Sequence, residues 1–415
     1  MSPLSTEARQ VGPPLTFDPW DHATIDDPYP TYARLRAEQP LYHNAEHDFW
    51  MLSRHADITD ALHADESFSN AMGVSLDKSA WGPHASSVMS FLAMDPPRHR
   101  RLRSLVSSGF TPKRVARLEP QIQALTDRYL DEVLPAAGSS LSASFDWIGE
   151  FAGKLPMDVI SEMVGVPESD RAEVRRLADL LVSRDDGLRD VPPAGIEAAL
   201  TLFEYYAEHV DRRRREPTDD LTSALLHSEV EGDRMSPEEV IAFLFLMVVA
   251  GNETTTKLLG NAMYHLSSRP ARLDRVLGDP SLVPVWIEET LRYDNSTQLV
   301  ARHLTRDITR HGVTAPAGAR LLLAYGSANR DESVFPHPDR YDLDRPREQL
   351  GRIMSFGAGR HFCLGSNLAK LEARVALSEF VRRVARVDVD HEHCVRFYSS
   401  NVRGFAHVPM TVQVR

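Results

Sequence analysis

The sequence predicts a mainly helical fold with a small β portion. Helical signals run through most of the chain, and the clearest is the stretch from Ser236 to about His265. Alternating or β-rich composition is sparse and falls at 49–52, 320–324 and 410–414. The segment 328–352 is irregular and rich in Pro, Asp and Arg, and loops of that length are usually functional or packed against something specific.

The first well-marked helix is expected from Arg98 to Ser108. Asp95-Pro96-Pro97 precedes it, with Asp95 as the expected N-cap and Pro tolerated in the first turn. The segment before it, 68–92, is apolar for a loop and has no clear period. We therefore expect a basic helix that follows an irregular, apolar connection.

The central helix has a complete start signal. Ser236 is the expected N-cap, Pro237 takes the first helical position, and Glu239 stands where a capping box requires it. Apolar residues from Ile241 to Ala250 surround this helix instead of forming a stripe, which predicts a buried position. The apolar run is about half as long as a membrane-spanning helix requires.

Composition limits the classes of function. The chain has 415 residues and a formal net charge of −12, which argues against non-specific nucleic-acid binding. Its two cysteines, Cys363 and Cys394, argue against a disulfide-stapled secreted fold. No linker or repeat divides the chain, so we expect one domain over 1–415 with a short N-terminal arm of about 1–16. No signal peptide is apparent at Met1–Pro14, and we expect a cytoplasmic protein without a membrane anchor.

The stretch Phe356-Gly-Ala-Gly-Arg-His-Phe-Cys363-Leu-Gly365 is the most informative in the sequence. Gly357 and Gly359 allow a tight turn and a close approach to a planar ligand. Cys363 begins a helix-like run, 364–383, where the helix dipole and free N–H groups favour a thiolate and tune a metal bound to it. A buried structural cysteine is the ordinary alternative, but the surrounding glycines, basic pair and helix start favour a ligand.

These ten residues match the haem-binding signature of the cytochrome P450 family, Phe-x-x-Gly-x-Arg/His-x-Cys-x-Gly. The resemblance implies a single cytochrome P450 fold and a haem b (iron protoporphyrin IX) cofactor with Cys363 as the axial iron ligand. Glu289 and Arg292 match the family's Glu-x-x-Arg pair, which would be buried and would lock the irregular loop 328–352. A solvated surface pair at i, i+3 is the alternative reading of these two charges.

The central helix carries Ala250-Gly251-Asn252-Glu253-Thr254-Thr255, which resembles the family's oxygen-binding motif. Glycine within a helix costs about 1 kcal/mol relative to Ala, and its use here makes sense if a flat group passes close to that face. Glu253 and Thr254 are the expected catalytic acid–alcohol pair. By the same resemblance, basic side chains hold the haem propionates and other residues of the two motifs touch the cofactor. The expected cofactor contacts are His99, Arg103, Ala250, Gly251, Arg302, Phe356, Gly357, His361, Cys363 and Gly365.

A largely apolar substrate is expected above the cofactor. Helical spacing places Leu246, Val249 and Thr254 on one face of the central helix, although core packing is the plain alternative for Leu246. By resemblance, Phe91 in the apolar connection and two residues near Arg302 also reach the pocket. The expected pocket residues are Phe91, Leu246, Val249, Gln298 and Val300.

The resemblance implies a monooxygenase that inserts one atom of O2 into an organic substrate, because thiolate donation promotes O–O cleavage. Electrons would come from a ferredoxin and an NAD(P)H-dependent ferredoxin reductase, and no reductase is expected to be fused to the chain. A basic set inside an acidic protein would form the docking face, consisting of Arg100, Arg101, Lys113, Arg114, Arg352, Arg360 and Lys370. The alternatives are a peroxide-driven peroxygenase and a non-catalytic haem sensor, neither of which needs the intact Glu253–Thr254 pair.

Overall fold

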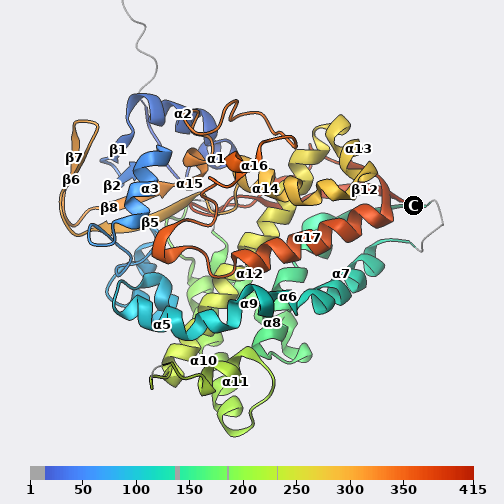
Figure 1. Cartoon of the computed structure of the whole chain (residues 1–415), viewed down its shortest axis with the longest axis horizontal. Coiled ribbons are helices and arrows are strands. Elements are labelled where there is room, and N and C mark those ends of the chain that lie inside the picture. Colours follow the sequence, from blue (N-terminus) through green and yellow to red (C-terminus); the bar gives the residue numbers. More distant parts are fainter. Residues whose placement is uncertain (1–14, 136–140, 185–186, 231) are drawn as a thin grey trace, which may run out of the picture.

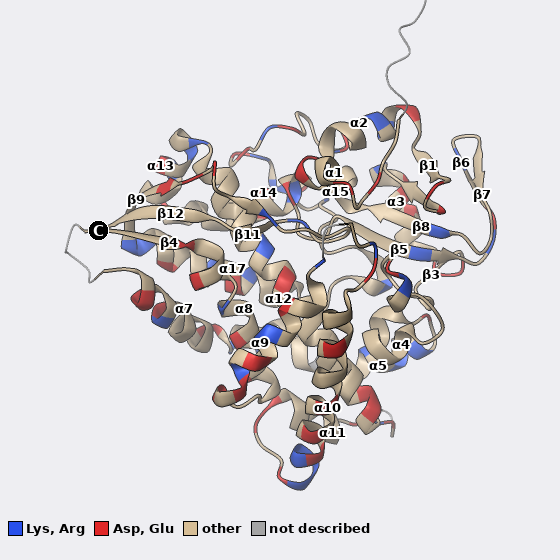
Figure 2. Cartoon of the chain, turned by 180° about the vertical axis from the view of Figure 1, so that it is seen from behind, with Lys and Arg blue, Asp and Glu red and all other residues tan. Residues whose placement is uncertain are grey.

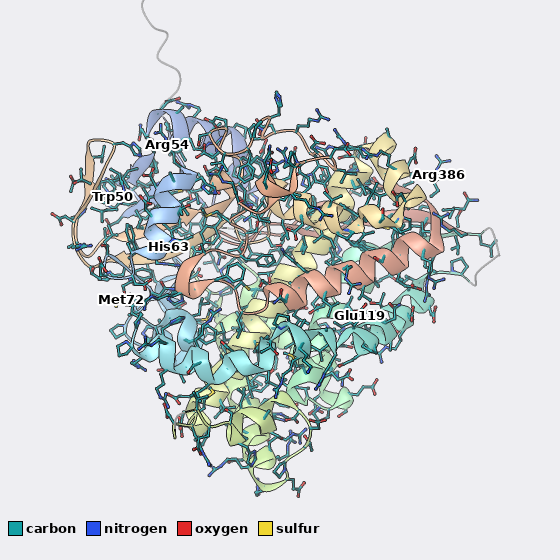
Figure 3. The ribbon with its side chains drawn as sticks, in the orientation of Figure 1. Trp50, Arg54, His63, Met72, Glu119 and Arg386 are labelled. Carbon is teal, nitrogen blue, oxygen red and sulfur yellow. The ribbon has the colours of Figure 1, made fainter. Side chains whose placement is uncertain are left out.

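The computed structural model describes residues 15–135, 141–184, 187–230 and 232–415. Most of the expected N-terminal arm, 1–16, therefore lies outside the described residues. Figure 1 shows a helical body with strands β1, β2, β5 and β8 at one end of its long axis and β12 with the C-terminus at the other. In Figure 3, Trp50 and His63 mark the first region, while Glu119 and Arg386 lie toward the opposite end.

Helices make up most of the described chain, as the sequence predicts. Their bounds are α1 His22–Asp26, α2 Tyr29–Glu38, α3 His55–His63, α4 Ala85–Met89, α5 Arg98–Ser107, α6 Pro112–Ala116, α7 Glu119–Val133, α8 Leu155–Val164, α9 Glu168–Val182, α10 Pro193–Arg215, α11 Leu221–His227, α12 Pro237–Ser267, α13 Pro270–Gly278, α14 Val283–Tyr293, α15 Tyr325–Ala328, α16 Arg347–Leu350 and α17 Ser366–Arg383. Short turns of 3-10 helix add η1 Lys78–Ala80, η2 Ser90–Ala93, η3 Ser108–Phe110, η5 Pro280–Leu282 and η6 Gly359–His361, and a π-helix covers η4 Trp147–Ala152.

The strands form small sheets. Their bounds are β1 Leu41–Asn44, β2 Phe49–Leu52, β3 Phe68–Ser69, β4 Ser142–Asp146, β5 Leu299–Leu304, β6 Ile308–Arg310, β7 Val313–Ala315, β8 Arg320–Ala324, β9 Val384–Val389, β10 Val395–Arg396, β11 Phe405–His407 and β12 Pro409–Val414. The largest sheet has the order β1-β2-β8-β5-β3, and a second has the order β4-β12-β9. Pairs β6–β7 and β10–β11 complete the set. In the antiparallel pair β5–β8, Val300 lies opposite Leu323 and Arg302 opposite Leu321, so Val300 and Arg302 share one face.

Several expectations about elements are confirmed. The strands predicted at 49–52, 320–324 and 410–414 are β2, β8 and β12. Ser236 caps α12 in a complete capping box with Glu239, because each side chain accepts a hydrogen bond from the other's backbone N–H. The expected capping role of Asp95 is wrong. Its carboxylate accepts instead from the backbone N–H of Asn70 at 2.8 Å and from the Ser69 hydroxyl, which ties the start of α5 to β3.

Helix α12 passes through the centre of the molecule and contacts α17 (Figure 1). Its N-terminal half packs into a core cluster with α5, α8 and α10, through residues such as Phe243 and Leu246. Its C-terminal half packs into a different cluster with α7, α14 and α17, through residues such as Leu259 and Met263. The polar stretch 250–257 lies between these two apolar halves, and within it Glu253 and Lys257 are buried while Ala250 is exposed.

By length and composition alone, α12 could cross a membrane. The whole helix is longer than the apolar run from Ile241 to Ala250 on which the sequence estimate was based. Within its most apolar window, 67% of the residues are buried inside the protein, as in the core helix of a soluble protein. Figure 2 shows Lys and Arg beside Asp and Glu on outer helices such as α7 and α9. Charged residues are thus plentiful on these outer helices, whereas most of the apolar window of α12 is buried.

Candidate functional site

Cys363 lies between the short turn η6 and the start of α17. Its backbone N–H donates to the carbonyl of Phe356 at 2.9 Å, which closes the loop around the cysteine. Gly357 and Gly359 both have a φ of 66°, a conformation that favours glycine. A Cβ on Gly359 would meet the backbone carbonyl of Leu62 at 2.2 Å, so this glycine is needed for packing against α3. That reason differs from the close approach to a planar ligand that the sequence suggested.

The Cys363 thiol has the environment of a ligand at a helix start. The backbone N–H groups of Gly365 and Ser366 hydrogen-bond to the sulfur. Burial raises the pKa of the Cys363 thiol, while the two N–H groups and the Arg103 guanidinium act in the opposite direction. Part of the residue nevertheless remains accessible to solvent.

Four basic side chains converge next to this loop, as the sequence predicts. The imidazoles of His99 on α5 and His361 on η6 have centroids 4.1 Å apart. Arg103, one turn after His99, donates to the carbonyl of Phe362 at 2.6 Å. Arg302 on β5 is buried, donates to the Ala301 carbonyl at 2.8 Å and hydrogen-bonds to the Tyr325 side chain.

The electrostatics of this basic cluster fit an anionic ligand. Burial and then Arg103 lower the pKa of His99 to about 4. Burial, followed by Arg302, His99 and Arg103, lowers the pKa of His361 to about 2. Among the described residues, His99 Nε2 and His361 Nδ1 are buried without a hydrogen-bond partner, and Arg302 forms no ion pair. Buried donors and cations of this kind suit carboxylates such as the haem propionates.

The polar stretch of α12 has an open side. Ala250 is exposed and Thr254 half-buried, although both stand near the middle of an otherwise buried helix. The Thr254 hydroxyl donates to the Ala250 carbonyl at 2.9 Å. The Thr254 carbonyl accepts in turn from the hydroxyl of Ser296 at 2.6 Å. Ser296 therefore ties the segment before β5 to α12 at the alcohol of the expected acid–alcohol pair.

The acid of that pair is buried and paired. Glu253 is 6% exposed, and its carboxylate lies 2.9 Å from the ammonium of Lys257, one helical turn later. Gly251 has a different neighbour, because a Cβ there would lie 2.4 Å from Ile160 on α8. Close packing of two helices thus accounts for the glycine, in place of the flat group that the sequence reading invoked.

Glu289 and Arg292 on α14 are fully buried and form an ion pair of 2.8 Å. Arg292 also donates to the carbonyls of Asn329, Pro338 and Arg340 at 3.1, 2.8 and 3.0 Å. Glu289 accepts from Arg345 at 2.9 Å and from the backbone N–H of Asp342 at 2.8 Å. The solvated alternative is excluded by this burial, since the pair fastens the irregular segment 328–352 that leads to the cysteine loop.

The expected pocket residues fall into two groups: four apolar side chains, and Gln298, whose amide is hydrogen-bonded elsewhere. Phe91 lies between His99 and Phe243, with ring centroids 5.9 and 6.1 Å away, beside the basic cluster. Val249 and Val300 are half-buried, while Leu246 is 5% exposed within the core cluster around α10. Gln298 points elsewhere: its amide donates to the Asn295 carbonyl at 2.8 Å and contacts the Tyr29 hydroxyl at 3.3 Å. Its side chain therefore forms hydrogen bonds in the interior between α2 and β5.

The sequence reading missed three site residues. Lys257 carried a recognisable signal, because a lysine one turn after a glutamate interrupts an apolar helix. Ser296 and Tyr325 carried none, since they meet Thr254 and Arg302 only through the fold.

The expected docking face is only partly free. Arg101 pairs with Asp233 and Glu239, Arg360 with Asp65, and Lys370 with Glu288. Arg100, Lys113, Arg114 and Arg352 are exposed and form no ion pair with the described residues.

Comparison with known proteins agrees with this arrangement. Residues 280–411 match the family model described as Cytochrome P450. The chain is 52% identical to "Putative cytochrome P450 123" of Mycobacterium tuberculosis (strain ATCC 25618 / H37Rv), over 98% of this chain and 99% of the relative. It is 38% identical to the "Vitamin D(3) 25-hydroxylase" of Pseudonocardia autotrophica, over 94% of each chain.

The fold agrees as well. The structure of cytochrome P450 CYP109Q5 from Chondromyces apiculatus superposes with a TM-score of 0.85 at 33% identity, covering 96% of this chain and 98% of that one. These relatives align over nearly the whole chain at identities that are high enough to assign the family. The chain belongs to the cytochrome P450 family and is a haem b enzyme of the monooxygenase type.

Proposed function

We propose that this P450 inserts one oxygen atom from O2 into a bound, largely apolar organic substrate, with electrons from a ferredoxin and its NAD(P)H-dependent reductase. The observation that carries the proposal is the Cys363 sulfur, which accepts two backbone N–H groups beside a basic cluster with unpartnered imidazole nitrogens. Thiolate ligation pushes electron density onto the haem iron and so favours cleavage of the O–O bond.

Cys363 would bind the haem iron, and His99, Arg103, Arg302 and His361 would bind the propionates. When bound, haem supplies the iron centre at which O2 is activated. Further contacts with the cofactor are proposed for Ala250, Gly251, Phe356, Gly357 and Gly365. Among these, Ala250 and Gly365 have the best support. Ala250 is exposed although it stands near the middle of α12, and a Cβ on Gly365 would meet no atom within 4 Å.

Glu253 and Thr254 would supply protons. The Thr254 hydroxyl already donates a hydrogen bond, and it can redirect that proton from the Ala250 carbonyl toward the open side of α12. Glu253 is the nearest carboxylate along the helix and is shielded from bulk water. This pair is the feature that a peroxygenase or a haem sensor would not require.

Phe91, Leu246, Val249 and Val300 are proposed to bound the substrate space. Their side chains are apolar, and two of them are only half-buried in the folded chain. A relative that is 38% identical is named for hydroxylation of vitamin D(3), a large apolar molecule. Gln298 is not retained, because the fold engages its amide.

Arg100, Lys113, Arg114 and Arg352 are proposed as the ferredoxin-docking charges, since they are exposed and free of ion pairs with described residues. Such charges raise the association rate with an acidic partner. We also propose that 1–415 is one domain, supported by α12, which joins two core clusters, and that the protein acts in the cytoplasm without a membrane anchor.

The test is turnover with defined partners. Compounds that shift the Soret band from low to high spin would be incubated with ferredoxin, reductase and NADPH under ¹⁸O2. One ¹⁸O atom in the product, with substrate-dependent NADPH consumption, is the expected result. Product formed only with added peroxide would favour a peroxygenase, and the absence of any product with every bound compound would favour a sensor.

A further inference from the structure

Phe362 is an exposed aromatic residue in the cysteine loop. It is 44% exposed, and among the phenylalanines, tyrosines and tryptophans of the described chain no other is classed as exposed. One peptide bond separates it from Cys363, the proposed iron ligand. A single exposed apolar residue needs no explanation by itself, so its surroundings decide what it does.

The Phe362 ring does not share the direction of its two neighbours. His361 belongs to the basic cluster, and Cys363 is the proposed ligand. Phe362 has φ −49° and ψ 133°, and in such extended backbone successive side chains point in different directions. Its ring lies 6.5 Å from the ring of Phe356, and the Lys370 ammonium of α17 lies 5.4 Å from that second ring. The Phe362 side chain therefore faces a different side of the loop from the groups that would hold the cofactor.

The backbone that carries this ring is fixed on both sides. Arg103 on α5 donates to the Phe362 carbonyl at 2.6 Å, and the Phe362 N–H donates to the Gly359 carbonyl at 3.2 Å. The next N–H, that of Cys363, donates to the Phe356 carbonyl at 2.9 Å. A side chain on a fixed backbone, with few rotatable bonds, loses little further freedom when a partner covers it. Phe362 is thus preorganised to serve as a contact.

Basic side chains lie on the elements next to this aromatic residue. Helix α5 supplies the hydrogen bond to the Phe362 carbonyl, η3 joins α5 to α6, and α6 packs against α17 (Figure 1). Five basic residues on α5, on α6 and its C-cap, and just before the cysteine loop are exposed and form no ion pair with the described residues. They are Arg100, Lys113, Arg114, Arg117 and Arg352.

The acidic residues beside this surface are already matched. Asp65 pairs with Arg360 at 2.6 Å, and Glu288 pairs with Lys370 at 2.6 Å. The unmatched charges around the cysteine loop are therefore positive, although the whole chain has a formal net charge of −12. A positive region on an acidic protein selects an acidic partner, because opposite potentials attract and like potentials repel.

We propose that Phe362 is the apolar anchor of the surface that receives the electron donor, and that this donor is an acidic iron–sulfur protein with an apolar patch beside its cluster. The proposal rests on the ferredoxin-dependent function proposed above and goes beyond its docking charges. Seated on Phe362, the donor would lie within one residue of Cys363.

The anchor and the charges have separate tasks. In protein interfaces a few buried aromatic residues carry most of the binding free energy, so burial of the Phe362 ring should mainly slow dissociation. Charges at the rim act mainly on the rate of association and on the choice of partner. The two tasks can be measured independently, and this separation is what the proposal adds to a docking face made of charges alone.

The first test measures binding rates without turnover. The haem-loaded enzyme would be passed over an immobilised plant-type [2Fe–2S] ferredoxin at several salt concentrations. Phe362→Ala should raise the dissociation rate about 10- to 100-fold and leave the association rate within about twofold. Lys113→Gln with Arg114→Gln should do the reverse, lowering the association rate about 10-fold at low salt and weakening its salt dependence. An unchanged dissociation rate in Phe362→Ala would overturn the proposal.

Two further variants serve as controls. Leu200 on α10 is 61% exposed, so Leu200→Ala removes an exposed apolar side chain from a different element and should change neither rate. Phe362→Leu keeps an apolar side chain at the anchor and should restore most of the binding. Equal dissociation rates in Phe362→Ala and Leu200→Ala would show that Phe362 is an ordinary surface residue.

The second test separates docking from an effect on the cofactor. Phe362→Ala should raise the KM for ferredoxin about 10- to 100-fold, in step with the dissociation rate, and leave kcat at saturating ferredoxin nearly unchanged. Reduction by dithionite needs no docking, so it should give the same amount of ferrous-CO complex in the variant and in the unaltered enzyme. A lower kcat together with an altered CO spectrum, at an unchanged KM, would refute the docking role.

If Phe362→Ala loads haem poorly, Phe362→Gln decides the question, because it fills much of the same space with a polar side chain. A dissociation rate equal to that of the unaltered enzyme would then refute the anchor, and a raised rate would support it. Failure of the proposed function looks different: the unaltered enzyme itself would neither bind the ferredoxin nor show substrate-dependent NADPH consumption with it.

Discussion

The imidazole rings of His99 and His361 lie 4.1 Å apart, one on α5 and the other two residues before Cys363. Neither ring has its full set of hydrogen bonds among the described residues, since His99 Nε2 and His361 Nδ1 are buried without a partner. These two imidazoles lie beside Arg103 and Arg302, and their two unpartnered ring nitrogens leave the basic cluster without a full set of hydrogen-bond partners. Such a group is stabilised by the carboxylates of a bound cofactor.

The pH dependence of apoprotein stability should report the burial of the neutral His99 imidazole. The pKa of His99 is about 4 in the folded chain and 6.5 ordinarily, so the unfolded chain takes up a proton first as the pH falls. His99 therefore contributes stability above pH 6.5 that is lost progressively toward pH 4. Urea unfolding of the apoprotein at several pH values should show this loss, and His99→Gln should reduce it. An identical slope in the variant would remove His99 from the explanation.

Replacing the proposed iron ligand should change the spectrum. Cys363→Ser or Cys363→His should abolish the red-shifted absorption of the thiolate-ligated ferrous-CO complex. Cys394→Ser is the control and should leave it intact, because Cys394 lies outside the site beside Asp390. A surviving thiolate spectrum in either Cys363 variant would refute the assignment.

Thr254→Ala should uncouple the enzyme, so that NADPH is consumed while peroxide replaces product. Ser296→Ala tests the newly found contact with the Thr254 carbonyl, and we expect a partial uncoupling, about 2- to 10-fold in the peroxide-to-product ratio, since loss of one hydrogen bond costs about 1 kcal/mol. Peroxide, product and NADPH would be measured together. Unchanged coupling in Thr254→Ala, with Thr255 also replaced, would exclude the hydroxyl.

Pocket variants should alter selectivity and spare the cofactor. Val249→Phe and Phe91→Ala should shift substrate affinity or the position of oxidation, while haem content and the CO spectrum stay unchanged. Gln298→Leu serves as a contrast, because its amide is bonded to Asn295 and its loss should affect stability more than selectivity. Loss of haem in both pocket variants, without a selective effect on any ligand, would contradict the assignment.

Glu289→Gln should destabilise the fold strongly. Glu289 is fully buried between Arg292 and Arg345, and removal of one partner from a buried ion pair costs about 3–5 kcal/mol. We expect haem loading to fall with stability, because the fastened segment leads into the cysteine loop. Urea unfolding and haem content would be measured, with the exposed Glu173→Gln as control. Equal stability of both variants would show that the pair is dispensable.

Local sequence was sufficient where neighbours in the chain make the structure. The capping box of Ser236 and Glu239 and the helix that begins after Cys363 depend on residues a few positions apart, and both were predicted correctly. The family signature around Cys363 likewise predicted the cofactor and the fold. Asp95 shows the limit of local reasoning, because an N-cap carboxylate was available but Asn70 and Ser69 compete for it through space.

The sequence by itself determined the chemistry of this protein: a cysteine at a helix start, an acid beside an alcohol, and a helix too apolar to lie on the surface. The tertiary structure decided how those groups are held. Gly251 faces Ile160, the Gln298 amide contacts the Tyr29 hydroxyl, and the Lys257 ammonium lies over the Phe397 ring. The physical reason is that hydrogen bonds and packing act over a few ångströms in space. They join segments that are far apart along the chain, and the local sequence does not show which segments will meet.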